Sequence, residues 1–246
     1  MQTTAIPEQS RHLAAVLASS PASTPAGIEL TTIGGFVIAH SGLSASDRSA
    51  FAALDKVDPS WLAAALSRHD EVVRELHAER AVFPMQFGTV VPAIALITPL
   101  LSAHGDELAR YFDQVADCDE FAVRFLVAKQ RAALDTGGGS GADYLRRRAA
   151  APRDEERQAE GRQAQMASVV ETLKALARDH QALTGRDELP VAGGRETLGK
   201  HAFLVPRAAA SDFQARVEAS QTDFDGVEVA CTGPWAPYSF RPRLAL

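Results

Sequence analysis

A glycine-rich stretch comes closest in this sequence to a cofactor-binding motif. The segment GGGSGA contains the pattern Gly-x-Gly-x-x-Ala at Gly137, Gly139 and Ala142. In dinucleotide-binding proteins such a pattern leaves a strand directly and opens a helix, so that backbone N–H groups meet a pyrophosphate. Here KQRAALDT separates it from the preceding predicted strand, and a P-loop ending in Gly-Lys-Ser/Thr is missing. The pattern therefore indicates a flexible loop, and a phosphate cradle over Gly137–Gly141 remains the alternative.

Other reactive residue types lack the spacing of a catalytic or metal site. His69 and His77 are separated by two helical turns, whereas one turn lets two imidazoles share a metal. The acidic residues within 113–120 lack the central glycine of a calcium-binding loop. Cys118 and Cys231 are too few for a disulfide framework and fit a reduced cytoplasmic setting. We therefore expect no catalytic residue, no cofactor and no metal ion, and a protein that is not an enzyme.

The composition is that of an ordinary globular protein. Of the 246 residues 46% are hydrophobic and 23% are charged, too apolar for disorder and too charged for a membrane protein. The net charge of -6 provides no general attraction for nucleic acid or anionic lipid. The longest apolar stretch, VVPAIALITPLL, contains two prolines and is shorter than the roughly 20 residues that span a bilayer. We expect neither a nucleic-acid nor a membrane partner.

Two segments combine proline and glycine with large apolar side chains. They are AVFPMQFGTVVP, residues 81–92, and TGPWAPYSF, residues 232–240. Proline and glycine at turn positions fix the backbone before any partner binds. The rings of the second segment either lock the C-terminus onto the core or present an apolar platform to another protein, since tryptophan and tyrosine bring large contact area at little entropic cost. Both interpretations are open, and they are compatible.

The first half of the chain predicts a mixture of strands and helices. RHLAAVL is predicted as a strand rather than a signal peptide, because its apolar run is short and follows no cluster of positive charge. The segment IELTTIGGFVIAHSG predicts a hairpin, since Gly34-Gly35 supplies the positive φ angles of a two-residue turn. Asp47 and Asp58-Pro59 are expected to start helices. An extended segment 81–91 and helical residues 93–112 follow.

The second half predicts a small sheet covered by helices. Alternating apolar residues from Phe121 to Val127 indicate a half-buried strand. A long helix ending at Gly185, a strand HAFLVPR, a helix and a strand GVEVACTG follow, an order that suits a ferredoxin-like arrangement. We therefore predict an α+β protein of two domains. Residues 1–112 form an N-terminal α+β domain, and residues 113–246 form a modified ferredoxin-like α+β domain with a long helical insertion and an aromatic C-terminal tail.

Several segments together resemble the gas vesicle protein F/L family. They are RHDEVVRELHAERAVFPMQFGT, GADYLRRR, AFLVPR and VEVACTGPWAPYSF. The combination of P-x-x-F-G-T with a terminal G-P-W-x-P-Y-x-F is specific, and the similarity covers nearly the whole chain from Leu30 on. Gln86 stands where the family usually has an arginine before Phe-Gly, and Ala236 stands where a proline is common. The F and L members are not separated by these features.

The resemblance implies a gas vesicle accessory or minor structural protein of the cytoplasm. Such a protein binds the hydrophobic, GvpA-like shell subunit, assists vesicle nucleation and assembly, and keeps the subunit from aggregating. Other gas vesicle accessory proteins are further expected partners, and the family fold is described as two α+β domains with a modified ferredoxin-like C-terminal domain. Two alternatives stay open, an adaptor that binds other vesicle accessory proteins and a nucleotide-dependent transferase using the glycine-rich loop.

On this interpretation the two Pro/Gly-framed segments carry the partner contacts. A second expected surface is the helix RHDEVVRELHAER. The expected contact residues are Phe83, Phe87, Trp235, Tyr238 and Phe240. The residues expected to frame them are Pro84, Gly88, Gly233 and Pro234.

Overall fold

The computed structural model describes residues 5–128, 141–184, 195–221 and 226–244, with only the backbone over 141–155. Helices are combined with antiparallel sheets, which confirms the predicted α+β class. The chain divides into two compact units, Met1–Glu120 together with Pro234–Leu246, and Phe121–Gly233. The aromatic tail, which the sequence assigned to the second domain, is thus grouped with the first unit. The boundary at residue 112 stays a prediction.

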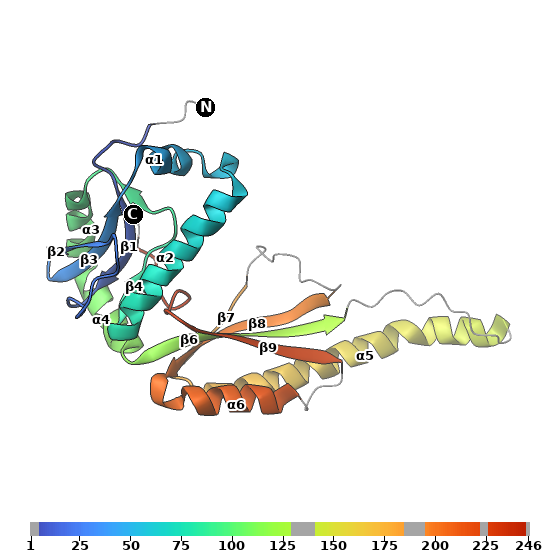
Figure 1. Cartoon of the computed structure of the whole chain (residues 1–246). Coiled ribbons are helices and arrows are strands. Elements are labelled where there is room, and N and C mark those ends of the chain that lie inside the picture. Colours follow the sequence, from blue (N-terminus) through green and yellow to red (C-terminus); the bar gives the residue numbers. More distant parts are fainter. Residues whose placement is uncertain (1–4, 129–140, 185–194, 222–225, 245–246) are drawn as a thin grey trace. The chain divides into compact units, whose positions relative to one another are not determined.

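The first unit is built on an antiparallel sheet with the order β2-β3-β1-β4, to which β5 adds by pairing with β1 (Figure 1). The bounds are β1 Arg11–Leu17, β2 Glu29–Ile33, β3 Phe36–Gly42, β4 Val82–Pro84 and β5 Val90–Val91. The predicted first strand and hairpin are both present. Gly34 and Gly35 have φ angles of 58° and 86°, which only glycine adopts without strain, so the turn joins β2 to β3 as expected.

Helices cover both faces of the first sheet. Their bounds are α1 Ala45–Phe51, η1 Leu54–Lys56, α2 Pro59–Glu79, η2 Ile94–Ile97, α3 Thr98–Ala103 and α4 Gly105–Val115. Val73 and Leu76 of α2 pack on one face in a core with Leu17 of β1. Tyr111 of α4 meets Phe83 of β4, with ring centroids 5.2 Å apart. Because both faces of the sheet are covered, the apolar residues of β1 form a continuous run and do not alternate with polar residues.

The helix starts follow the capping rules, with one shift. Asp58 caps α2 by accepting a hydrogen bond from the backbone N–H of Ser60 at 2.8 Å, as predicted. The helix α1 is capped by Ser44 rather than by Asp47, because both reciprocal hydrogen bonds of a capping box are formed between these two residues. Asp47 is therefore the third helical residue, and α1 begins earlier than expected.

The second unit has a sheet with the order β7-β8-β6-β9 and two helices, α5 and α6, on the same face (Figure 1). The bounds are β6 Cys118–Ala128, α5 Gly141–Lys174, β7 Asp179–Ala182, β8 Arg195–Pro206, η3 Arg207–Ala209, α6 Ala210–Ser220 and β9 Val227–Trp235. Its core centres on Phe121, Phe203 and Phe213, all at most 1% exposed. The alternation predicted for the first of these strands is confirmed.

The long helix was predicted to continue to Gly185, and this was wrong. It ends at Lys174, and Asp179–Ala182 forms the strand β7 instead. His180 pairs there with Phe203 of β8 in an antiparallel register. Pairing with a strand far along the chain overrides the local helical pattern.

Candidate partner-binding site

The C-terminal tail, defined here as residues 234–244, is anchored in the first unit by a buried carboxylate. Glu120 is 6% exposed. Its two oxygens accept hydrogen bonds from the backbone N–H of Ser239 at 2.8 Å and from the Ser239 hydroxyl at 2.6 Å. Ala236 and Phe240 are each 4% exposed. The tail is thus part of the core of the first unit, which the sequence had offered as one of two interpretations.

Tyr111 of α4 links the tail to the sheet. Its hydroxyl lies 2.9 Å from the carbonyl oxygen of Val82 and 3.4 Å from that of Pro237, so it can donate to either. Burial raises the pKa of Tyr111 well above its usual value, so the hydroxyl keeps its proton and remains a donor. The tail and β4 are therefore tied to the same buried side chain.

Replacing Tyr111 by phenylalanine is expected to lower the free energy of unfolding by about 1 kcal/mol, because the ring packing stays and only a buried hydrogen bond is lost. Urea unfolding followed by tryptophan fluorescence measures this, since Trp61 and Trp235 both belong to the first unit. An unfolding midpoint equal to that of the natural sequence would contradict the role assigned to this hydroxyl.

A tight turn explains the P-x-x-F-G-T motif. The carbonyl of Gln86 accepts hydrogen bonds from the N–H of Thr89 at 3.1 Å and from its hydroxyl at 2.7 Å. Gly88 has a φ of 87°, the left-handed value that the third position of such a turn requires. On either side, Met85 N–H donates to Ala14 O and Leu13 N–H donates to Thr89 O. The motif therefore positions Gln86 and Phe87 at a fixed place beside β1.

Arg241 lies at the centre of the site. Its Nε donates to Tyr238 O at 3.0 Å and its Nη1 donates to Pro84 O at 2.6 Å. The guanidinium carbon is 5.3 Å from the ring centroid of Tyr238 and 5.8 Å from that of Phe83. Burial lowers the pKa of the Arg241 guanidinium, and the nearby Tyr111 partly offsets this shift. The side chain is held in one direction by backbone carbonyls and rings.

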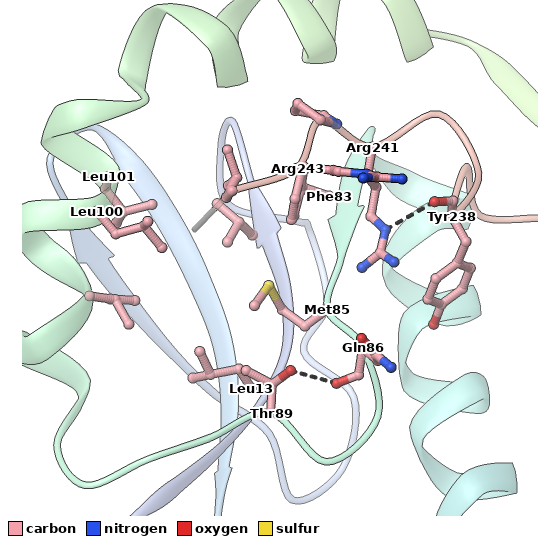
Figure 2. Close-up of a pocket in the computed structure, with 14 residues that line it drawn as sticks. Leu13, Phe83, Met85, Gln86, Thr89, Leu100, Leu101, Tyr238, Arg241 and Arg243 are labelled. Carbon is pink, nitrogen blue, oxygen red and sulfur yellow. Dashed lines mark hydrogen bonds between the residues drawn. The ribbon is translucent and has the colours of Figure 1, made fainter. Parts of the chain in front are cut away.

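Two hollows adjoin Arg241. The inner hollow has a volume of about 370 Å³, in the range of small ligand sites. Its lining is mainly aliphatic and aromatic: Leu13, Val16, Phe83, Met85, Gln86, Thr89, Ile97, Leu100, Leu101, Tyr238, Arg241, Pro242, Arg243 and Leu244. Figure 2 shows Leu100 and Leu101 on one side and Gln86, Tyr238 and Arg241 on the other. The hollow is thus apolar at one wall and cationic at the opposite edge.

The outer hollow shares this edge and continues along α2. It measures about 420 Å³ and is lined by Leu66, Ser67, His69, Asp70, Gln86, Phe87, Tyr238 and Arg241. Leu66 is 43% exposed. The two hollows therefore meet at Gln86, Tyr238 and Arg241, which we call the shared edge.

A ring cluster supports Phe87 from beneath. Its ring centroid lies 5.7 Å from those of both His12 and His69 and 5.5 Å from that of Phe51. Burial lowers the pKa of His12 to about 4, and burial also lowers the pKa of His69. Both rings are neutral at pH 7, so this cluster behaves as apolar packing around Phe87.

The five predicted contact residues differ in their exposure. Phe83 and Phe240 are each 4% exposed, Trp235 is 39% exposed, and Phe87 and Tyr238 are half-buried. Partner contact at all five stays a prediction, and their exposure favours Phe87, Trp235 and Tyr238, with the two buried rings holding the surface. Of the frame residues, Gly88 lies in the turn with a positive φ, Pro84 ends β4, and Gly233 and Pro234 lie in the last part of β9, where Gly233 also has a positive φ.

Sequence reasoning missed Arg241 and Glu120 as parts of the site. Arg241 directly follows the aromatic motif, and an arginine beside several rings is a usable signal for a cation held over aromatic faces. Glu120 gave no such signal, because its partner Ser239 is far away in the sequence.

In the described part of the chain, titratable side chains come together in pairs: His77 Nε2 lies 2.9 Å from Asp119 Oδ1, and His180 Nε2 lies 2.9 Å from His201 Nδ1. Over the described residues no three histidine, cysteine or acidic side chains come close enough for a metal ion. Cys118 is buried, and burial raises the pKa of the Cys231 thiol to about 11, so that thiol stays protonated. Gly137 and Gly139 lie outside the described residues. Among those described, no helix has both the length and the apolarity needed to cross a bilayer.

The fold is shared with solved gas vesicle proteins. The crystal structure of GvpF from Anabaena sp. PCC7120 matches with a TM-score of 0.67 and 20% identity, over 94% of this chain and 95% of that chain. GvpF from Microcystis aeruginosa matches with a TM-score of 0.66 and 17% identity, over 94% and 98%. At these identities the likeness establishes the fold alone.

Sequence comparison gives the family. Gas vesicle protein L of Streptomyces sp. (strain CB03234) is 29% identical over 191 residues, covering 74% of this chain and 71% of that protein. The family model described as gas vesicle synthesis protein GvpL/GvpF matches residues 6–242. The chain therefore belongs to the GvpL/GvpF family, which confirms the resemblance noted from its motifs. This is a family of gas vesicle proteins and not a known enzyme family.

Proposed function

We propose that this chain binds the hydrophobic shell subunit of gas vesicles, assists nucleation and assembly of the shell, and keeps the subunit from aggregating. Family membership supports a place at the gas vesicle in the cytoplasm. The binding role rests on the exposure of Trp235. Its side chain is 39% exposed, whereas Ala236 and Phe240 in the same tail are buried. A rigid backbone thus presents a large apolar ring at little entropic cost.

The surface proposed for the shell subunit includes Trp235 and the lining of the outer hollow. Leu66 and Phe87 add apolar area there, and Tyr238 adds a ring with a polar end. Apolar area removed from water contributes roughly 25 cal/mol per Å², so transient coverage of an apolar face lowers the tendency of a shell subunit to self-associate. Such a role needs no reactive group.

We also propose that the second unit is a modified ferredoxin-like domain. The order β6-α5-β7-β8-α6-β9 is the βαββαβ arrangement of that fold. The strand order β7-β8-β6-β9 and the placement of both helices on one face support this proposal. The long α5 is then the helical insertion expected from the sequence.

Changing Trp235 and Leu66 together to serine is expected to reduce co-purification of a co-expressed shell subunit at least about tenfold, because buried aromatic anchors dominate interface energies. Leu96→Ser is the matched control, since Leu96 is 61% exposed but lines neither hollow. Pull-down and light scattering of the shell subunit give the readout.

If the folded double variant co-purified as much shell subunit as the natural sequence, the proposal that the subunit binds at this surface would be wrong. The adaptor alternative would be supported instead if the natural sequence captured other vesicle accessory proteins but no shell subunit. Circular dichroism of each variant separates loss of binding from loss of fold.

A further inference from the structure

The shared edge carries a cation that forms no direct ion pair among the described residues, although the buried Glu120 carboxylate is near enough to act on it electrostatically. Arg241 uses Nε and Nη1 on backbone carbonyls, and no carboxylate among the described residues lies within ion-pair distance of its guanidinium. Asp70 lines the outer hollow but forms no ion pair with it. A half-buried charge is costly unless it is paired. The remaining N–H donors of Arg241 are thus available to an anion that enters from the hollows.

The second feature is the shape of the site. The inner and outer hollows meet at the shared edge, and each is large enough for one or two side chains. A small ligand would fill one hollow and leave the other empty. A stretch of extended polypeptide can place a side chain in each hollow and a third at the edge between them, because every second side chain of an extended chain points to the same face.

From charge and shape together we propose that this groove recognises a protein segment in which an acidic residue is flanked by aliphatic residues. The carboxylate accepts hydrogen bonds from Arg241 at the shared edge. One aliphatic side chain enters the inner hollow, against Leu100 and Leu101 (Figure 2). The other covers Leu66 and Phe87 in the outer hollow. This deepens the proposed function and rests on its premise that the partner is a protein.

A carboxylate fits the edge because the cation is already oriented. Arg241 is fixed by two carbonyls and two rings, so little side-chain freedom is lost on binding. Exposed Arg243 adds a second positive charge at the rim of the inner hollow. The chain as a whole carries a net charge of -6, so attraction of an acidic segment is local to this groove.

The test uses a blocked, fluorescein-labelled peptide, Ser-Leu-Ser-Glu-Ser-Leu-Ser, titrated with the full chain and followed by fluorescence polarisation. Replacing its Glu by Gln is expected to weaken binding about tenfold, since hydrogen bonds to a charged group are the strong ones. Replacing both Leu by Ser is expected to abolish measurable binding. Equal affinity of the Glu and Gln peptides would overturn the inference.

Charge changes at Gln86 test the groove without disturbing the anchored Arg241. Gln86 is exposed and lies on the shared edge. Gln86→Arg is expected to strengthen binding of the Glu peptide about threefold, and Gln86→Glu to weaken it about threefold. These changes correspond to the interaction energy of a partly exposed charge pair. Gln9→Arg is the control, because exposed Gln9 lines neither hollow and the change adds the same charge. An equal effect of Gln9→Arg would contradict recognition at the edge.

Failure of this inference and failure of the proposed function are distinguishable. If the Glu and Gln peptides bind with equal affinity while capture of the shell subunit still requires Trp235, recognition of an acidic segment is contradicted and shell binding is supported. If the Glu peptide binds as predicted but the shell subunit is not captured, recognition of an acidic segment is supported and the proposed shell binding is contradicted.

Discussion

Deletion of residues 234–246 is expected to leave the first unit close to unfolding at 25 °C. The deletion removes Phe240, whose burial alone contributes about 1.5–3 kcal/mol. It also removes the two hydrogen bonds that Ser239 donates to the Glu120 carboxylate, at about 1.5–3 kcal/mol for hydrogen bonds to a charged group. With the hydrogen bond of Arg241 to Pro84 also lost, the total is about 5 kcal/mol. Stabilities of natural proteins are about 5–15 kcal/mol, so the effect is large.

Urea unfolding followed by fluorescence measures this loss. The deleted chain retains a single tryptophan, Trp61, which lies in the first unit beside Phe51 with ring centroids 5.5 Å apart. Arg243→Ser is the control within the same segment, since this exposed residue should change stability by less than about 0.5 kcal/mol. A deletion variant that unfolds at the same urea concentration as the full chain would refute the anchoring of the tail.

A synthetic peptide of residues 234–246 provides a second check on the deletion. If the tail stabilises by binding the folded first unit, adding the peptide should raise the unfolding midpoint of the deleted chain with increasing concentration. The same peptide with Phe240 replaced by serine should do so less, because Phe240 is buried in the natural chain. Stabilisation by both peptides to the same degree would argue against Phe240 as the anchor.

Local sequence signals predicted much of the fold. The Gly34-Gly35 turn, the cap at Asp58 and the alternation from Phe121 each depend on residues within a few positions of one another, and all three are confirmed. Turn geometry, capping and strand alternation are properties of the local backbone, so they can be recognised without knowing the rest of the chain.

Features that depend on distant pairing were not predicted. The strand β7 forms because Asp179–Ala182 pairs with β8, and a local helical pattern conceals it. The sequence assigned the tail to the second domain, whereas it is grouped with the first unit, where its anchor Glu120 lies more than a hundred residues earlier in the chain. The shared edge likewise joins Gln86 to Arg241 across the sequence. Aromatic content indicated a surface, but only packing separates exposed Trp235 from buried Phe240.

Acid should destabilise the first unit strongly through His12. Burial is the largest cause that lowers its pKa from 6.5 to about 4, the nearby His69 lowers it further, and Asp47 opposes the shift. Its Nε2 is buried without a hydrogen-bond partner in the described structure. Since the unfolded chain takes up the proton more readily, the stability is fully present above pH 6.5 and is lost as the pH falls towards 4. Lowered pKa values of His40 and His69 act in the same direction.

His12→Phe is expected to remove this part of the pH dependence while keeping a ring against Phe51, whose centroid is 5.1 Å from that of His12. Between pH 7.5 and pH 5 the natural chain should lose about 2 kcal/mol more stability than the variant, and about 3 kcal/mol more by pH 4. Urea unfolding followed by the fluorescence of Trp61 and Trp235 at each pH gives both values. Carboxylates that titrate in the same range affect both proteins alike, so the difference isolates the imidazole. Parallel pH profiles of the two proteins would show that His12 is not kept neutral by the fold, and that the ring cluster beneath Phe87 admits water.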